Sequence, residues 1–326
     1  MTLTFNLIEE SICCTRKFIS LIIFIHLVPP RPGDGVCARA TWARNGITIV
    51  GGGMQGSAFN QLDLPQGFFL DDNQTAYVVD EGNNRIMKWE RGASSGQLVA
   101  GGKGKGNQND QLYVPTDVVV DKNGTMYISD SGNRRVQRWF RGAQSGETII
   151  ENVVASGIAQ DDQGSLYVVD YERGEVRKWR VGDINGQLIV KGLKTPRLLF
   201  VDQYRSLFVT DEGNHRVIKL DAGSMETSIV AGGLLGNGTE QLHSPTSVIV
   251  DQLGTVYVAD TLNDRIMRWP RDAKSGSVIV GGQGRGSRSD QLHFPFDLSF
   301  DLAGNLYVVD YFNDRVQLFS INKSLC

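Results

Sequence analysis

The stretch YVVDEGNNRIMKW, residues 77–89, decides the fold because the chain contains six versions of it. In each version an apolar, β-branched run ends at an aspartate, a polar turn follows, and a second such run resumes. The aspartates are separated by 50, 40, 41, 49 and 50 residues. A period of this length predicts a solenoid or a propeller. The other versions are YISDSGNRRVQRW (127–139), YVVDYERGEVRKW (167–179), FVTDEGNHRVIKL (208–220), YVADTLNDRIMRW (257–269) and YVVDYFNDRVQLF (307–319).

Each version belongs to a unit of four short strands. In the second unit the expected strands are residues 115–121, 125–130, 135–139 and 147–151, separated by turns rich in Gly, Asn and Ser. No 3.6-residue period competes with this pattern. Four-stranded units repeated around an axis form a β-propeller, which leaves only short sheet edges exposed. The sequence therefore predicts an all-β, six-bladed β-propeller of four-stranded antiparallel blades.

The two chain ends predict how the ring closes. The sixth unit stops after its third strand, residues 315–319, whereas GITIVGG (46–52) matches the fourth strand GSVIVGG (276–282). We therefore expect the N-terminal strand to complete the last blade, with Ile47–Val50 pairing with Val316–Phe319. An open array would leave exposed edges at both ends.

The aspartate and the arginine of the repeated phrase are expected to form ion pairs inside the scaffold. These pairs are Asp80 with Arg85, Asp130 with Arg135, Asp211 with Arg216, Asp260 with Arg265, and Asp310 with Arg315. The pattern D-x-x-N-x-R-[VI], preceded by P-x-x-[VIL]-x-[VF]-D, resembles the NHL repeat family of six-bladed propellers over residues 46–326. Unit three departs from it, with Glu175 in place of the arginine and Ala159 near the expected proline. Blade three is therefore expected to be the least regular.

Composition restricts the classes of function. The chain is 40% hydrophobic and 21% charged, which is typical of a soluble globular protein. Its net charge of -3 gives no basic field, so nucleic-acid binding is not expected. The four cysteines (Cys13, Cys14, Cys37 and Cys326) include no CxxC pair, which excludes a zinc ribbon and a disulfide-dense scaffold.

The first forty residues are expected to be a signal peptide or leader, and residues 41–326 the propeller. Arg16 and Lys17 precede the apolar run 18–28, and ARA (38–40) fits the small-x-small cleavage rule. This pattern predicts secretion. An uncleaved membrane anchor at residues 18–28 and a buried N-terminal helix are the alternatives. Four N-x-[ST] sequons are glycosylation candidates in a secreted protein: Asn73, Asn123, Asn237 and Asn322.

Cys37 and Cys326 are expected at the corner between the third and fourth strands of the closing blade. A disulfide there would staple the ring and, in the chain-entropy model, contribute roughly 4–5 kcal/mol. Cleavage after Ala40 would remove Cys37 and with it this disulfide.

Four residues precede the first strands of their units by two positions and are expected near the mouth of the central channel. They are Asp63, Tyr113, His243 and His293. Two histidines and an aspartate are residue types that bind metals. Both histidines nevertheless stand in identical QLH contexts, as duplication would produce, so we expect no metal site and no cofactor. The sequence also lacks G-x-S-x-G, and its Gly-rich loops lack GxxxxGK[ST].

The turns and connections predict two different faces. The turns that contain Asn73, Asn123 and Asn322 belong to one face, and the blade connections belong to the other. Four connections are long (roughly 53–63, 103–113, 233–243 and 283–293), whereas those before units three and four are about ten residues shorter. We expect the long connections to form a raised rim that is open over blades three and four. Ligand contacts are expected to involve Asp63, Tyr113, His243 and His293 with their neighbouring loops.

Together these observations favour a non-catalytic binding or scaffold propeller, secreted and monomeric, that recognises a protein, peptide or glycan through its loop-bearing face. The resemblance implies an alternative, because some NHL-like propellers are lyases that cleave amidated-peptide precursors with channel metals, and related propellers hydrolyse lactones. A second alternative is an intracellular adaptor related to NHL ubiquitin-ligase proteins but lacking the RING domain. Membrane association is expected only if the leader is an uncleaved anchor.

Overall fold

The repeated phrase forms the second and third strands of every blade. β4 (Ala76–Asp80) and β5 (Arg85–Trp89) of blade one pair in antiparallel register from Ala76 with Trp89 to Asp80 with Arg85. All five residues of β4 are buried, because neighbouring blades cover both faces of the sheet. This double burial explains why the phrase has a continuous apolar run rather than a strict alternation. The structure, a computed structural model, describes residues 36–52, 54–180, 182–324 and 326.

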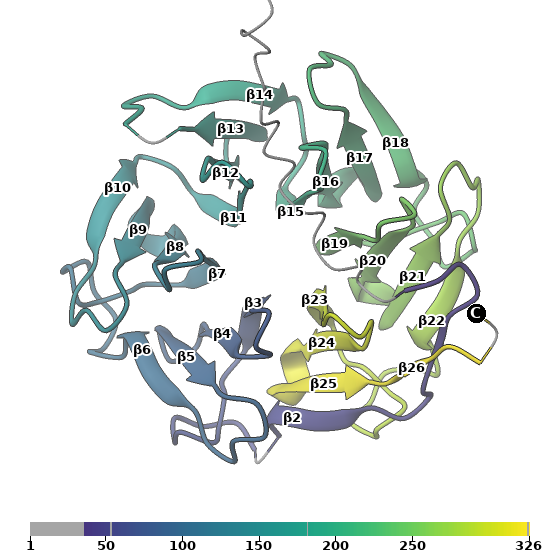
Figure 1. Ribbon diagram of the computed structural model, residues 1–326, viewed down its shortest axis with the longest axis horizontal. Coiled ribbons are helices and arrows are strands. Elements are labelled where there is room, and N and C mark those ends of the chain that lie inside the picture. Colours follow the sequence, from purple (N-terminus) through teal and green to yellow (C-terminus); the bar gives the residue numbers. More distant parts are fainter. Residues whose placement is uncertain (1–35, 53, 181, 325) are drawn as a thin grey trace, which may run out of the picture. The chain divides into compact units, whose positions relative to one another are not determined.

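Six four-stranded antiparallel blades surround a central axis (Figure 1), so the predicted architecture is confirmed. Blade one also contains β3 (Pro65–Leu70) and β6 (Gln97–Gly101). Blade two is β7 (Pro115–Val120), β8 (Met126–Asp130), β9 (Arg135–Trp139) and β10 (Glu147–Glu151). Blade three is β11 (Ala155–Gln160), β12 (Leu166–Asp170), β13 (Glu175–Trp179) and β14 (Gln187–Lys191). Blade four is β15 (Pro196–Val201), β16 (Leu207–Asp211), β17 (Arg216–Leu220) and β18 (Thr227–Gly232). Blade five is β19 (Ser247–Val250), β20 (Val256–Asp260), β21 (Arg265–Trp269) and β22 (Ser277–Gly281). Blade six is β23 (Pro295–Phe300), β24 (Leu306–Asp310), β25 (Arg315–Phe319) and β2 (Ile47–Gly51).

Short 3-10 turns join the second and third strands in four blades. They are η1 (Ser131–Asn133), η2 (Glu212–Asn214), η3 (Thr261–Asn263) and η4 (Tyr311–Asn313). Each ends at a residue with left-handed backbone angles, such as Arg134 at φ 55°.

The ring closes as predicted, because β2 is the outer strand of blade six (Figure 1). Ile47 pairs with Leu318, Thr48 with Gln317, and Val50 with Val316. Strands from the two ends of the chain therefore share one sheet.

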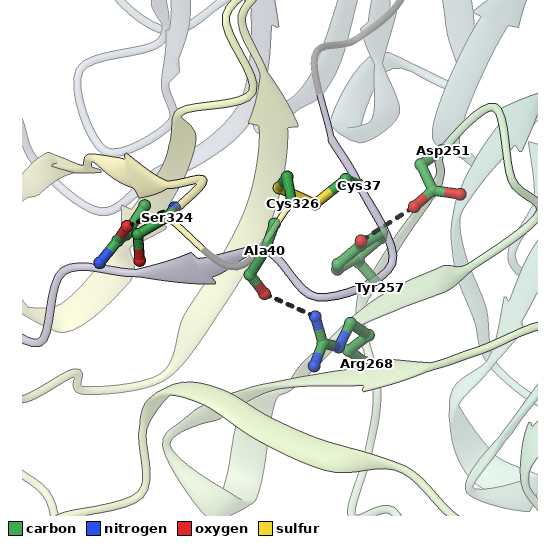
Figure 2. Close-up of a disulfide and its surroundings, with 8 residues drawn as sticks. Cys37, Ala40, Asp251, Tyr257, Arg268, Ser324 and Cys326 are labelled. Carbon is green, nitrogen blue, oxygen red and sulfur yellow. Dashed lines mark hydrogen bonds between the residues drawn. A yellow bond between two sulfur atoms is a disulfide. The ribbon is translucent and has the colours of Figure 1, made fainter.

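The chain ends are joined a second time just outside this blade. The short strands β1 (Thr41–Trp42) and β26 (Ile321–Asn322) pair with each other where other blades have a third-to-fourth turn. Beside them Cys37 and Cys326 form a disulfide, with Cα atoms 6.0 Å apart (Figure 2). It links positions 289 residues apart, so in the chain-entropy model it contributes about 6 kcal/mol.

The segment 37–42 packs into the ring. Ala40 is fully buried and its carbonyl oxygen accepts a hydrogen bond from Arg268 Nη1 at 2.8 Å (Figure 2). Trp42 stacks on Phe300 and donates from Nε1 to the carbonyl of Gly304. The fold therefore includes residues on both sides of the expected leader boundary after Ala40. The apolar run 18–28 lies outside the described residues, among which no helix is long and apolar enough to cross a membrane.

Blade three keeps four strands, and its departure from the pattern is confined to two places. Ala155, rather than Ala159, occupies the proline position, because it pairs with Asp170 as Pro115 pairs with Asp130. In its turn Gly174 takes the left-handed angles, at φ 62°. The missing arginine is replaced by Arg173, which reaches Asp170 at 2.8 Å.

The long connections do not build the raised rim that the sequence led us to expect. In blade one the connection before β3 descends beside the blade, and the carbonyl of Phe59 accepts a hydrogen bond from the N–H of Gly96, just before β6 begins. β6 then runs back to Gly101, which pairs with Arg85 at the connection-bearing end. Leu62 of the same connection is fully buried in a cluster that contains residues of blades one and six.

The same hydrogen bond recurs in blades two, five and six, where Gly146, Gly276 and Gly46 donate to the carbonyls of Asn109, Thr239 and Ser289. Radial blades diverge toward the periphery, and each long connection runs along the resulting gap with one leucine fully buried there and most of its other residues exposed. The connections therefore pack between blades, and the expected notch over blades three and four does not follow from their length.

Candidate functional site

The four residues selected from the sequence occupy equivalent places beside the second-strand aspartates of their blades, and each side chain has different contacts. The backbone N–H groups of Asp63, Tyr113 and His293 each donate to the second-strand aspartate of their blade at 2.7 Å, and that of His243 does so at 2.6 Å. Among the described residues, no group of three or more His, Cys, Asp or Glu side chains is arranged to hold a metal ion.

Each of these side chains has its own local contact. Asp63 accepts a hydrogen bond from Gln55, and the Tyr113 ring lies under Lys105 Nζ at 3.9 Å. His243 packs edge-on against His215, and His293 packs against Phe312 with ring centroids 4.8 Å apart.

Two other positions of the repeat line the axis more directly, and sequence reasoning missed them. The first follows the proline position, in the innermost strand of each blade. We call these residues the inner ring: Gln66, Thr116, Ser156, Arg197, Thr246 and Phe296. The second directly follows the second-strand aspartate. We call these residues the outer ring: Glu81, Ser131, Tyr171, Glu212, Thr261 and Tyr311.

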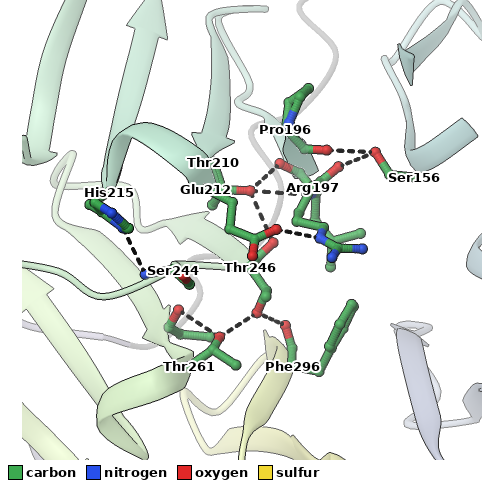
Figure 3. Close-up of polar contacts among 12 residues, drawn as sticks. Ser156, Pro196, Arg197, Thr210, Glu212, His215, Ser244, Thr246, Thr261 and Phe296 are labelled. Atoms are coloured by element: carbon green, nitrogen blue, oxygen red, sulfur yellow. Dashed lines mark hydrogen bonds and ion pairs between the residues drawn. The ribbon is translucent and has the colours of Figure 1, made fainter. Parts of the chain in front are cut away.

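Contacts join the two rings within blades and join neighbouring blades around the axis. Thr246 and Thr261 are hydrogen-bonded at 2.7 Å, and Thr246 also donates to the carbonyl of Phe296 in the next blade (Figure 3). Ser156 bridges in the same way to the carbonyls of Pro196 and Arg197 (Figure 3). These buried hydroxyl groups link blade three to blade four and blade five to blade six without adding a charge.

Blade four contributes a cation that is already paired. Arg197 Nε lies 2.5 Å from Glu212 Oε2 (Figure 3). The guanidinium carbon of Arg197 lies 5.0 Å from the centre of the Tyr171 ring. The pair neutralises the charge on this wall, although the guanidinium still acts on Glu81 across the axis.

Blades one and six contribute a half-buried carboxylate beside aromatic rings. Glu81 Oε2 accepts hydrogen bonds from Gln66 Nε2 at 2.6 Å and from the Tyr311 hydroxyl at 3.2 Å. Burial raises the pKa of Glu81, because the charged carboxylate loses hydration there. Burial, and then the neighbouring Glu81 charge, also raise the pKa of the Tyr311 phenol, which keeps it a hydrogen-bond donor.

Behind the rings, two fully buried aspartates connect the innermost strands. Asp297 of blade six accepts from the N–H of Phe68 in blade one and from Ser247 Oγ in blade five. Asp117 of blade two accepts from the N–H of Ile158 in blade three. Burial raises the pKa of Asp297 to about 6, and burial together with the Asp297 charge raises that of Asp117. Their hydrogen bonds hold the first strands in place below the mouth.

The backbone at the mouth is held in strained conformations. Residues just before the first strands have left-handed angles, for example Leu64 at φ 52° and Phe294 at φ 62°. The neighbouring blade supports each of these, because Asp314 accepts from the N–H of Leu64 and Asp264 from that of Phe294. In the joint between blades four and five this acceptor is His215 Nδ1, 3.2 Å from Ser244 N (Figure 3). Strain of this kind collects at functional sites and persists only where surroundings fix it.

Comparisons with known proteins support the fold alone. No protein-family model and no curated protein matches the chain. Solved structures do match it, among them an auxiliary nutrient binding protein from Bacteroides thetaiotaomicron, with a TM-score of 0.69, 12% identity and coverage of 87% of this chain and 76% of that chain. A virginiamycin B lyase from Staphylococcus aureus matches with a TM-score of 0.56, 10% identity and coverage of 82% and 98%. A gluconolactonase from Xanthomonas campestris matches with a TM-score of 0.63, 12% identity and coverage of 90% and 99%.

Proposed function

We propose that the protein is a secreted, NHL-type propeller that binds a small ligand or a short segment of a protein, peptide or glycan at the channel mouth formed by the inner and outer rings. The notable feature is the contrast between a repeated framework and a varied mouth. The second-strand aspartate is present in all six blades, yet the residue after it is Glu, Ser, Tyr, Glu, Thr or Tyr.

This variation is the single observation that carries the proposal. A purely structural position in six copies of one unit has the same task six times, as the buried aspartates show. The outer-ring position instead places half-buried acids and aromatic rings around one axis in blades one, three, four and six, and buried hydroxyl groups in blades two and five. An asymmetric opening on a near-symmetric rigid scaffold is suited to recognising one asymmetric ligand.

The proposal of secretion has support at the surface and at the N-terminus. All four sequon asparagines are exposed, so Asn73, Asn123, Asn237 and Asn322 are accessible to glycosylation. A disulfide between Cys37 and Cys326 suits an oxidising compartment. We place the end of the leader before Cys37, because Ala40 and Trp42 belong to the buried edge of the ring.

Binding is tested with a matched pair of aromatic substitutions. Phe312 at the mouth is 47% exposed, and Phe140, at the start of a turn on the opposite face, is 54% exposed. Isothermal titration calorimetry would measure binding of glucose, N-acetylglucosamine, gluconolactone and blocked tripeptides to the wild type, Phe312→Ser and Phe140→Ser. We expect at least one probe to bind the wild type and Phe140→Ser but not Phe312→Ser.

Two results would contradict this function. Binding that is lost only in Phe140→Ser would place the site on the opposite face. Turnover of gluconolactone by the wild type would favour the catalytic alternative over a binding module.

A further inference from the structure

Three carboxylates at the joint between blades one and six have no cationic partner among the residues that the structure describes. They are Asp63, Glu81 and Asp314, and none of them forms a salt bridge there. Asp314 has a direct counterpart in blade five, Asp264, which accepts a backbone N–H in the same way. Arg285 pairs with Asp264 at 3.2 Å, so the equivalent charge is compensated in blade five and not in blade six.

The charge of Asp63 acts on the other two carboxylates. Burial raises the pKa of Glu81 and that of Asp314, and the charge of Asp63 raises both further. The side chain of Asp63 packs over Gly82, where a Cβ atom would lie 2.4 Å from the carboxyl carbon. Because residue 82 is a glycine, the Asp63 carboxylate can pack against the backbone directly after Glu81.

Aromatic rings border this acidic group. Tyr311, whose hydroxyl binds Glu81, lies 4.8 Å from Phe312 and 5.7 Å from Phe294 between ring centroids. Phe294 and Phe312 are themselves 5.2 Å apart, and Phe312 is exposed. The faces of such rings attract cations.

An unpartnered acceptor stands at the same place. Gln66 is 93% buried, and its Nε2 donates to Glu81 while its Oε1 has no hydrogen-bond partner in the structure. Reversing the amide would direct Oε1 at the Glu81 carboxylate, so the hydrogen bond to Glu81 fixes the orientation. A buried carbonyl oxygen without a donor is costly, and a ligand that supplies N–H groups would remove that cost.

We propose that the joint between blades one and six is a subsite for a cationic nitrogen, an ammonium or guanidinium group attached to an apolar stem. Glu81, Asp63 and Gln66 Oε1 accept its N–H groups, and Phe312 with Tyr311 contacts the stem and the cation. This inference rests on the proposed binding function and specifies the chemical class of the ligand. The paired Arg197 and Glu212 on the facing wall leave the opposite side of the mouth without a net charge.

Calorimetric titration of the full chain with four blocked tripeptides tests the subsite. They are acetyl-Gly-Lys-Gly-amide, its arginine analogue, its acetyl-lysine analogue and its glutamate analogue. Butylamine is included to distinguish a peptide side chain from a free amine. We expect the lysine or arginine peptide to bind, the acetyl-lysine and glutamate peptides to bind at least roughly tenfold more weakly, and raised salt to weaken the binding.

Two Glu→Gln variants test whether the charge of Glu81 is the one that binds the cationic peptide. Glu81→Gln should weaken binding of the cationic peptide at least roughly tenfold. Glu90→Gln should not, because Glu90 lies in the same blade at the start of the third-to-fourth turn on the opposite face. Equal thermal unfolding temperatures of the two variants would show that both are folded.

Each other outcome overturns the inference. Equal affinity for the lysine and acetyl-lysine peptides, or unchanged affinity in Glu81→Gln, excludes a cation subsite. Calcium binding that Glu81→Gln abolishes, without a response to either cationic peptide, assigns the carboxylates to a metal instead. A neutral ligand that is lost in Phe312→Ser and kept in Glu81→Gln would leave the binding function intact while refuting its cationic specificity.

Discussion

The blades with long connections and the blades with short ones use the same repeated phrase differently. In blade two Arg135 binds Asp130 and also donates to the carbonyls of Asn107, Gln108 and Gln111 in the long connection. Blades one, five and six repeat this arrangement with Arg85, Arg265 and Arg315. In blade four, within the described chain, Arg216 hydrogen-bonds to Asp211 alone.

The asparagine of the phrase shows the same difference. Asn133 donates both to Asp130 and to the carbonyl of Gly106 in the long connection, whereas Asn214 of blade four donates to Asp211. The phrase is therefore chiefly an anchor for the chain that enters each blade. Where the connection is short, as before blades three and four, the phrase makes fewer hydrogen bonds to the connection. Blade three lacks the arginine at the usual position, and Arg173 with Gly174 forms its turn.

The largest difference between the two kinds of blade is expected on removing the arginine. Arg135→Met leaves the fully buried Asp130 without its cation and three connection carbonyls without their donor, so it should cost about 4 kcal/mol of unfolding free energy. Arg216→Met also leaves the buried Asp211 without its cation, but Arg216 is already 30% exposed and donates to no connection carbonyl, so this variant should cost only about 1–2 kcal/mol. Urea unfolding of both variants measures this difference. Equal losses of unfolding free energy would contradict the distinction between blades with long and short connections.

A smaller difference is expected for the leucine that each connection buries. Leu112 is fully buried between blades, so Leu112→Ala should cost about 3 kcal/mol. Leu193 of the short connection before blade four is only partly buried, and Leu193→Ala should cost about 1 kcal/mol. Urea unfolding compares the two leucine variants. A larger loss of unfolding free energy in Leu193→Ala than in Leu112→Ala would contradict the prediction.

The smallest expected effect concerns the joint between blades four and five. Burial, and then the nearby His243, lower the pKa of His215, whose Nδ1 accepts from Ser244. The unfolded chain therefore binds more protons near neutral pH, and stability should fall as pH drops below about 6.5 and level off below the lowered folded-state pKa. Lys194, Glu212 and Asp260 also act on this ring.

His215→Asn would reproduce the acceptor of blade one, where Asn84 Oδ1 accepts from the N–H of Val114. The difference in unfolding free energy between this variant and the wild type should change by about 1 kcal/mol or less between pH 7.5 and pH 5. A difference that does not depend on pH would show that His215 titrates alike in the folded and unfolded chains.

The sequence predicted the fold because the fold depends on repeated features. The period, the strand runs and the surplus strand at residues 46–52 together gave the blade number and the partner of β25. The same alignment also brought Cys37 near Cys326. The alignment wrongly assigned Ala159 to the proline position of unit three, because the connection before this unit is shorter. Ala155 holds that position, and its separation of 15 residues from Asp170 is the feature of the sequence that shows it.

The role of the candidate residues in binding stays a prediction. What positions such as Tyr113 and His293 share in the structure is a backbone hydrogen bond to the second-strand aspartate. The outer ring is not marked by any residue that the six phrases share. The residue after each aspartate is one of the positions at which they differ, and that column was visible in the alignment. The pairing of Glu81 with Tyr311 joins opposite ends of the sequence, so only ring closure brings it about.

Hydrogen–deuterium exchange with the tightest-binding probe of the calorimetric panel tests the central claim, that the mouth between the inner and outer rings is the binding site. The account predicts slower exchange in residues 64–68 and 311–315 on binding, with no change in the opposite turns 71–75 and 121–125. Protection confined to those opposite turns, or to the peripheral connections, would contradict it.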